Sequence, residues 1–241
     1  VKIFKDKVFV ADSENTLNCY SIKDGSKLWQ LKTENSFINS PKKLSIVLKN
    51  NIVYFNNSLG DITAVDIDNG SLKWQISTQN SEIYEEIFNF KTSEIIAGHK
   101  SILFSNNKNE IYSVDQMSGT INWKQKVNSD LRPTLIGNVV LTISSEGYLY
   151  IIENETGNII RVTDIFNRFK DKKRKEIKPI GFLVGINDIF LTTDKGSLLV
   201  IDKSTGKTKS IFKFSKGKLS RPLSSNQNMF IIKDNSIIKL N

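Results

Sequence analysis

The sequence predicts an all-β fold made of repeated four-stranded antiparallel sheets, and three observations support this. A motif of an acidic residue, three further residues and a glycine recurs, with 38 to 49 residues between successive glycines. Alternating apolar and polar residues flank each copy, which is typical of half-buried strands. No helical period extends beyond about ten residues, and the only candidate segment is 164–175. Sheets repeated at such a period are typical of a β-propeller.

The repeated motif predicts a tight turn between two strands of each sheet. Four copies have an acidic residue four positions before the glycine, and the first copy has Ser21 there. Glycine adopts positive φ at little cost, which a tight hairpin turn requires. The glycines are Gly25, Gly70, Gly119, Gly157 and Gly206, and the acids are Asp66, Asp115, Glu153 and Asp202.

Each turn belongs to a predicted blade, which is a sheet of four strands in chain order. A second hairpin lies upstream of each motif, and Ser-Pro or Arg-Pro pairs open several first strands, where proline interrupts no hydrogen-bond ladder. We expect one propeller domain over 1–241, because a single sheet cannot bury both of its faces. The predicted blades are 1–33, 41–78, 94–127, 133–163, 179–214 and 221–241, the last of them incomplete.

A tryptophan follows the turn glycine by four residues in the first three blades. These residues are Trp29, Trp74 and Trp123. A large aromatic side chain at a fixed position in each blade is predicted to pack between neighbouring blades. The fourth and fifth blades have Arg161 and Ser210 at this position, so we expect looser junctions there.

Composition excludes several kinds of site. The 241 residues include 34 Lys and Arg against 25 Asp and Glu, which gives a net charge of +9. The single cysteine, Cys19, excludes an intrachain disulfide, and its strand pattern indicates a small core residue. The single histidine, His99, excludes a site with two histidines and lies in a predicted surface turn. No apolar stretch is long enough for a membrane-spanning helix.

One strongly basic segment interrupts the repeats. Residues 168–178 hold seven Lys or Arg and two acidic residues, with Lys172, Lys173, Arg174 and Lys175 consecutive. This basic loop is either a solvated connection or a contact for anionic lipid headgroups or an acidic partner. No nucleic-acid-binding module accompanies the charge, so we expect no nucleic-acid partner.

A second segment, 204–208, resembles the end of a phosphate-binding loop. Position 201, where such a loop has its first glycine, is Ile201, and a strand rather than a helix is predicted to follow. The segment is therefore predicted to be a hairpin turn.

The blade motif resembles the tryptophan-docking motif of the pyrroloquinoline-quinone-type propellers, Ala-x-Asp-x-x-x-Gly-x-x-x-Trp. Ala64, Asp66, Gly70 and Trp74 match it at every position. Within that superfamily the chain is most similar to the BamB family of outer-membrane protein assembly factors, through the order of its blades, the stretch 163–168 and the incomplete last blade. The resemblance implies an eight-bladed ring at the periplasmic face of the bacterial outer membrane, with a lipid anchor upstream of residue 1.

The resemblance also implies a non-catalytic scaffold with no cofactor or metal, a monomer within a complex. Its partners would be the periplasmic domains of the central, BamA-like assembly subunit and unfolded outer-membrane proteins. The family binds the central subunit through two successive inter-blade loops, which correspond here to 30–41 and 76–95. The matching residues are Leu31 and Lys32 in the first loop and Glu82, Glu85 and Glu86 in the second.

Two alternatives belong to other functional classes, a quinoprotein-type dehydrogenase and a ligand-sensing propeller ectodomain. The dehydrogenase would require a Ca²⁺ site, a catalytic aspartate and often a vicinal disulfide, and a single cysteine excludes the disulfide. The motif acids recur once in each blade, as structural features do, whereas a calcium site would bring several carboxylates together.

Overall fold

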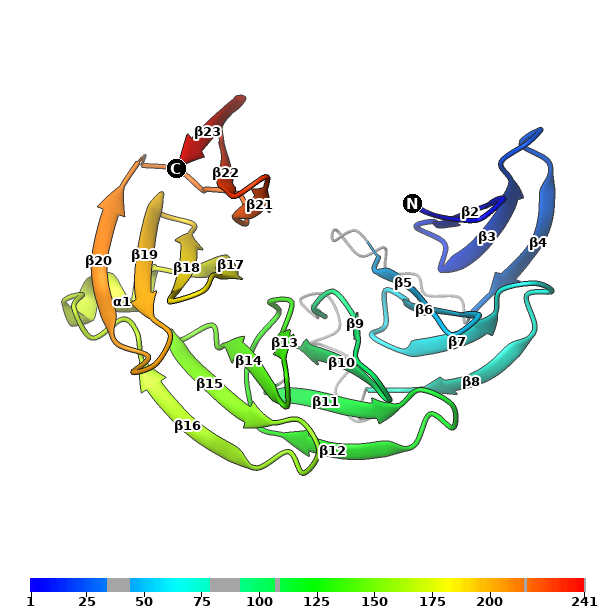
Figure 1. The fold of residues 1–241 in the computed structure, drawn as a ribbon, viewed down its shortest axis with the longest axis horizontal. Helices are drawn as coiled ribbons and strands as arrows, with labels where there is room; N and C mark the ends of the chain where they lie inside the picture. Colours follow the sequence, from blue (N-terminus) through cyan, green and yellow to red (C-terminus); the bar gives the residue numbers. More distant parts are fainter. Residues whose placement is uncertain (34–43, 79–91, 107–108, 215, 241) are drawn as a thin grey trace. The chain divides into compact units, whose positions relative to one another are not determined.

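The computed structural model describes residues 1–33, 44–78, 92–106, 109–214 and 216–240. These residues form six antiparallel sheets, and the strands of each sheet follow one another in chain order (Figure 1). The sheets confirm the predicted all-β fold class. The chain divides into two compact units, Val1–Pro133 and Thr134–Asn241, each with three sheets. A single domain and an eight-bladed ring stay predictions.

The first unit contains blades 1 to 3, each with four strands. Blade 1 consists of β1 (Lys2–Phe4), β2 (Lys7–Ala11), β3 (Thr16–Ser21) and β4 (Lys27–Lys32). Blade 2 consists of β5 (Ile46–Lys49), β6 (Ile52–Asn56), β7 (Ile62–Asp66) and β8 (Leu72–Ile76). Blade 3 consists of β9 (Ile96–Ala97), β10 (Ser101–Asn106), β11 (Glu110–Asp115) and β12 (Ile121–Gln125).

The second unit contains blades 4 to 6 and a short helix. Blade 4 consists of β13 (Thr134–Ile136), β14 (Val139–Ile143), β15 (Tyr148–Glu153) and β16 (Ile159–Asp164), followed by α1 (Asp171–Glu176). Blade 5 consists of β17 (Pro179–Val184), β18 (Asp188–Thr193), β19 (Ser197–Asp202) and β20 (Thr208–Lys213). The described part of blade 6 has three strands, β21 (Leu223–Ser225), β22 (Asn228–Lys233) and β23 (Ser236–Leu240). The helix falls partly within the one predicted candidate, 164–175.

The repeated motif forms the turn between the third and fourth strands, as predicted. In blade 3, Oδ1 of Asp115 accepts hydrogen bonds from the backbone N–H groups of Met117 and Ser118, at 2.9 and 2.8 Å. The N–H of Gly119 donates to the Asp115 carbonyl at 3.1 Å, and Gly119 has a φ of +75°. The motif acid therefore satisfies turn donors, and the glycine supplies the left-handed conformation.

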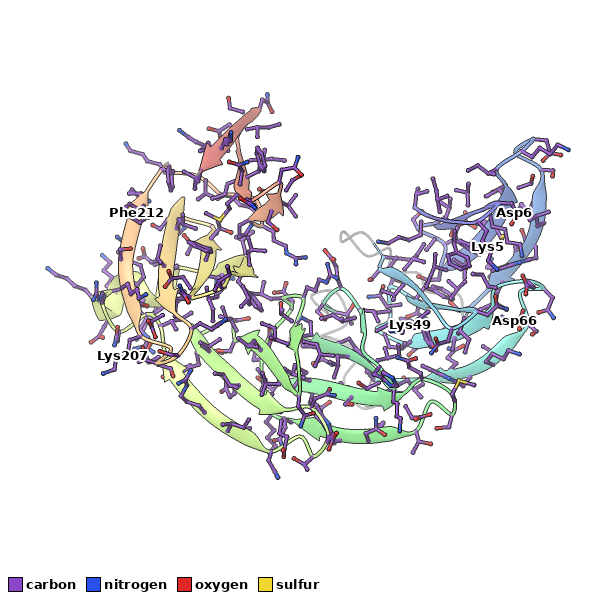
Figure 2. The ribbon with its side chains drawn as sticks, in the orientation of Figure 1. Lys5, Asp6, Lys49, Asp66, Lys207 and Phe212 are labelled. Atoms are coloured by element: carbon purple, nitrogen blue, oxygen red, sulfur yellow. The ribbon has the colours of Figure 1, made fainter. Side chains whose placement is uncertain are left out.

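The other blades repeat this turn with small changes. Asp66 and Asp202 accept backbone N–H groups in the same way, and Ser21 does so through its hydroxyl. Figure 2 labels Asp66 at the turn of blade 2 and Lys207 at the turn of blade 5. The segment 204–208 is accordingly a hairpin turn between β19 and β20, as the sequence predicts.

We expect Asp115→Asn to weaken the dependence of stability on acid pH. The backbone N–H of Ser118 holds the pKa of the Asp115 carboxyl below its ordinary value, so its stabilising charge is fully present at neutral pH. That contribution is lost as pH falls through the folded pKa. The amide accepts the same hydrogen bonds but does not titrate. Urea unfolding of both proteins at neutral and acid pH checks this, and an equal loss for both would contradict it.

The tryptophans of the first two blades pack on the turn glycines of the blades that follow. A Cβ atom added to Gly70 would lie 2.7 Å from Cδ2 and Cε3 of Trp29, and one added to Gly119 would lie 2.7 Å from Cδ2 of Trp74. The indole N–H of Trp74 donates to the Gln116 carbonyl at 2.9 Å. Glycine is therefore required at these turns for two reasons. It adopts the positive φ, and its missing side chain leaves space for the indole ring.

Arg161 takes the tryptophan position at the junction of blades 4 and 5. Its Nη2 donates to the Lys203 carbonyl at 3.2 Å, and its Nη1 donates to the Ser204 carbonyl. Lys203 lies three residues before Gly206, as Gln116 lies three before Gly119, so the arginine keeps the acceptor that an indole uses. Thr163 covers Gly206 in place of a ring. The looser junction expected between blades 4 and 5 stays a prediction.

Candidate functional site

The two predicted partner-binding loops follow β4 and β8 in the chain. Leu31 and Lys32 lie at the end of β4. Glu82, Glu85 and Glu86 lie outside the described residues, so their contribution stays a prediction. The structure describes residues on both sides of each loop, and these fix where the loops begin and end.

Buried hydrogen bonds hold the start of each loop. The N–H and the Oγ1 of Thr33 both donate to the Asn15 carbonyl, at 3.2 and 2.9 Å, while Oδ1 of Asn15 accepts the N–H of Ser58 in the next blade at 2.8 Å. Thr78 lies eight residues after its turn glycine, as Thr33 does, and its Oγ1 donates to the Gly60 carbonyl at 2.9 Å. The two loops therefore leave equivalent positions of adjacent blades.

One asparagine connects the ends of the two loops. Oδ1 of Asn56 accepts the N–H of Ser45 at 2.6 Å, and its Nδ2 donates to Oγ1 of Thr92 at 2.6 Å. The hydroxyl of Ser45 also accepts the N–H of Ile95 at 3.0 Å. All of these groups are buried, so their hydrogen bonds are costly to break. Asn56 consequently holds Ser45 and Thr92, the described residues near the ends of the two loops, close to each other.

Leu31 and Lys32 differ in how far their side chains are exposed to a partner. Leu31 is half-buried and packs against the apolar cluster that includes Phe9, Leu17 and Phe55. Lys32 is exposed. The side chain available to a partner at the end of β4 is therefore mainly the lysine, which supplies one positive charge beside the first loop.

The basic loop forms helix α1 in the second unit. All six residues of α1 are charged, with Asp171 in the first turn and Lys173, Arg174 and Lys175 in the last turn, which suits the helix dipole. None of them is buried. Arg174 is held by Asp164 at 2.6 Å, and Nζ of Lys173 lies 5.2 Å from the centre of the Phe169 ring. Contacts with blade 4 and its connection therefore fix a helix that has no buried face.

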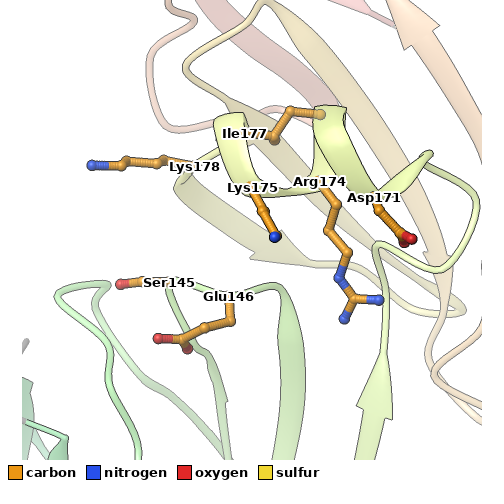
Figure 3. Close-up of a pocket in the computed structure, with 7 residues that line it drawn as sticks. All are labelled: Ser145, Glu146, Asp171, Arg174, Lys175, Ile177 and Lys178. Carbon is orange, nitrogen blue, oxygen red and sulfur yellow. The ribbon is translucent and has the colours of Figure 1, made fainter.

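Two hollows lie beside α1. The first, of about 470 Å³, lies between α1 and the turn that carries Ser145 and Glu146, and Arg174 and Lys175 point toward that turn (Figure 3). The second has a volume of about 460 Å³ and includes residues from blade 5. We call it the lysine hollow, and the charged residues that line it are Lys170, Lys172, Lys173, Glu176, Lys195 and Lys213.

The single cysteine and the single histidine of the sequence lie apart from these loops and hollows. Cys19 is fully buried beside Trp29 in the β3–β4 register, and burial raises the pKa of its thiol. His99 is exposed. Across the described ranges, no three His, Cys, Asp or Glu side chains group closely enough to hold a metal ion. No helix among them is both long and apolar enough to cross a membrane.

Comparison with known families assigns the chain to one of them. The model of the family described as "Outer membrane protein assembly factor BamB" matches residues 3–163, about two thirds of the sequence. The chain belongs to the BamB family. The first four copies of its turn motif, its tryptophans and both candidate loops lie within the matched residues.

A solved BamB structure has the same fold. The crystal structure of BamB from Moraxella catarrhalis superposes with a TM-score of 0.79 over 98% of this chain and 70% of that chain, at 16% sequence identity. This similarity confirms the propeller-type fold. No curated protein matches the sequence.

The BamB-family blades also use residues that the sequence pattern did not indicate. Gln116 is 1% exposed, and its Nε2 donates to the carbonyls of Gly98 and Ser101 while its Oε1 accepts a hydrogen bond from Asn50. Lys195 and Lys213 join the lysine hollow from blade 5. Gln116 occupies a variable position of the turn motif, and Lys195 and Lys213 lie outside it. The roles of all three follow from which strands the fold brings together.

Proposed function

We propose that this protein is a non-catalytic scaffold in the assembly of outer-membrane β-barrel proteins. The observation that supports this most strongly is the match of the BamB family model over residues 3–163. The proposed location is the periplasmic face of the outer membrane, and the lipid anchor expected upstream of residue 1 belongs to the same proposal. Its proposed partner is the periplasmic part of a BamA-like assembly subunit, and unfolded outer-membrane proteins are the proposed clients.

The docking surface that we propose consists of the two loops that leave blades 1 and 2. Asn56 holds their ends together, and Thr33 and Thr78 fix their starts, so a partner can contact both loops at once. Lys32 offers a positive charge beside the first loop, and Glu82, Glu85 and Glu86 add negative charges in the second. Loops whose ends are fixed by a sheet are common sites of protein recognition.

Charge reversal in these loops is expected to weaken capture of the assembly subunit. We expect Lys32→Glu combined with Glu85→Lys and Glu86→Lys to reduce affinity roughly tenfold or more, since opposed like charges are costly at an interface. Leu31→Ala should weaken capture as well, but it also removes packing from blade 1. Binding of purified BamA-like periplasmic domains, followed by calorimetry, measures the effect.

Lys23→Glu is the matched control, because Lys23 is exposed in the turn at the opposite end of the same blade. It should bind as the unmodified protein does. Unchanged affinity of the triple variant would move the interface away from these loops. Quinone absorbance in the purified protein, or Ca²⁺-dependent dye reduction, would instead contradict the scaffold function as a whole.

A further inference from the structure

The positive charge of this protein is concentrated in its second unit. Residues 134–241 include 18 Lys and Arg against 10 Asp and Glu, a net charge of +8, whereas residues 1–133 include 16 against 15, a net charge of +1. The lysine hollow lies in the second unit and is lined by five lysines and one glutamate. An anionic ligand is therefore attracted chiefly to this unit.

Among the lysines of the hollow, the described residues offer a carboxylate partner only to Lys195, whose Nζ lies 3.8 Å from Oδ2 of Asp194. In the first unit Lys7 pairs with Asp68 at 2.6 Å, and Lys124 pairs with Glu110 at 3.1 Å. Within the described ranges, no ion pair includes Lys170, Lys172 or Lys213. All three are exposed. Their mutual repulsion is therefore relieved most by an anion that enters the hollow.

The composition of α1 is not explained by packing. None of its residues is buried, and the apolar floor of the hollow is Ile177, which is 2% exposed. The hollow therefore presents exposed lysine side chains to a ligand, while its one apolar lining residue is too buried to contribute much contact area. Phosphate groups, which are compact and anionic, match such a surface.

We propose that the lysine hollow binds the headgroup phosphates of anionic phospholipids and holds the second unit against a membrane surface. The inference rests on the proposed function only for the presence of a membrane. Basic clusters bind anionic membranes at about fivefold in affinity for each lysine near the surface. Three lysines without carboxylate partners are thus enough for a strong, salt-sensitive contact.

The lining argues against the other polyanionic partners. Protein interfaces are depleted in lysine and depend on buried aromatic or arginine anchors, and the lining includes neither. Nucleic-acid sites combine phosphate contacts with groups that stack on bases or read their edges, and the hollow offers lysines alone among its cations. An anionic membrane surface needs only positively charged side chains, without aromatic anchors or groups that read bases.

Flotation of the purified protein with vesicles tests the proposal. The vesicles contain phosphatidylglycerol and phosphatidylcholine in a one-to-three ratio, or phosphatidylcholine alone. We expect binding to the anionic vesicles at low salt and loss of binding at high salt. Lys170→Gln, Lys172→Gln and Lys213→Gln together should weaken it by about a hundredfold.

The matched control replaces Lys23, Lys207 and Lys239, three exposed lysines outside the hollow, by Gln. It removes the same charge and should bind nearly as the unmodified protein does. Equal loss in both triple variants would show attraction by net charge alone and would overturn the proposal. A hollow variant that loses duplex DNA binding but keeps vesicle binding would overturn it as well. Since no assembly subunit is present, the result is independent of the docking test.

Discussion

Gly70→Ala is expected to destabilise the first unit by about 2–5 kcal/mol, because it combines left-handed strain with overpacking against the half-buried Trp29. Gly70 has a φ of +74°, a conformation that alanine adopts at a cost. The new methyl group would lie 2.7 Å from two ring carbons of Trp29, so the indole must move away from the blade 2 turn. That movement would also lengthen the 3.3 Å hydrogen bond from the indole to the Ile67 carbonyl.

Gly25→Ala separates the two causes. Gly25 has nearly the same φ, +73°, yet no atom of the described chain lies within 4 Å of the position that its Cβ would take. Strain alone predicts a loss of about 1–2 kcal/mol there. All three tryptophans of the sequence lie in the first unit, so tryptophan fluorescence during urea unfolding reports on the unit that contains both glycines. Equal losses for the two variants would mean that the indole contact at Gly70 contributes nothing.

The repeated turns show how much of this fold the sequence could predict. The acid, the glycine and the alternating strands act within a dozen residues of one another, so local sequence determines the hairpin. Because the motif recurs five times, the same local argument predicts the matching hairpin in each of the first five blades. The position of the tryptophan could also be predicted, because its fixed distance from Gly25, Gly70 or Gly119 placed it on the same strand of the first three blades.

The proposed partner-binding surfaces combine residues that lie far apart in the chain, and the sequence predicted these surfaces only in part. Lys172 and Lys173 were visible as a charge run, whereas Lys195 and Lys213 lie far along the chain and reach the same hollow through β18, β19 and β20. Asn56 joins the two candidate loops from the end of β6, in a stretch that shows no motif. A contact between distant residues leaves no spacing to recognise in a single sequence.

Trp74→Ala is expected to cost about 3–5 kcal/mol, the range for removing a large buried aromatic side chain. Trp74 is 8% exposed, and its ring centre lies 5.7 Å from that of Tyr54. Its indole N–H and the hydroxyl of Tyr54 both donate to the Gln116 carbonyl, so the change also removes a donor from a buried acceptor. Trp74→Phe keeps most of the apolar contact but lacks the donor, and its loss should be intermediate.

Combining Trp74→Ala with Gly119→Ala tests whether the indole and the glycine act as one contact. Gly119→Ala alone forces a methyl group to within 2.7 Å of the Trp74 ring, whereas in the double variant that ring is absent. Only the strain at φ +75° then remains, so the double variant should be more stable than the sum of the two losses predicts, by about 1–3 kcal/mol. Urea unfolding followed through Trp29 and Trp123 measures all four proteins. Additive losses would show that the stability of blade 3 does not depend on the contact between this indole and this turn. The recurring distance between turn glycine and tryptophan would then have another cause.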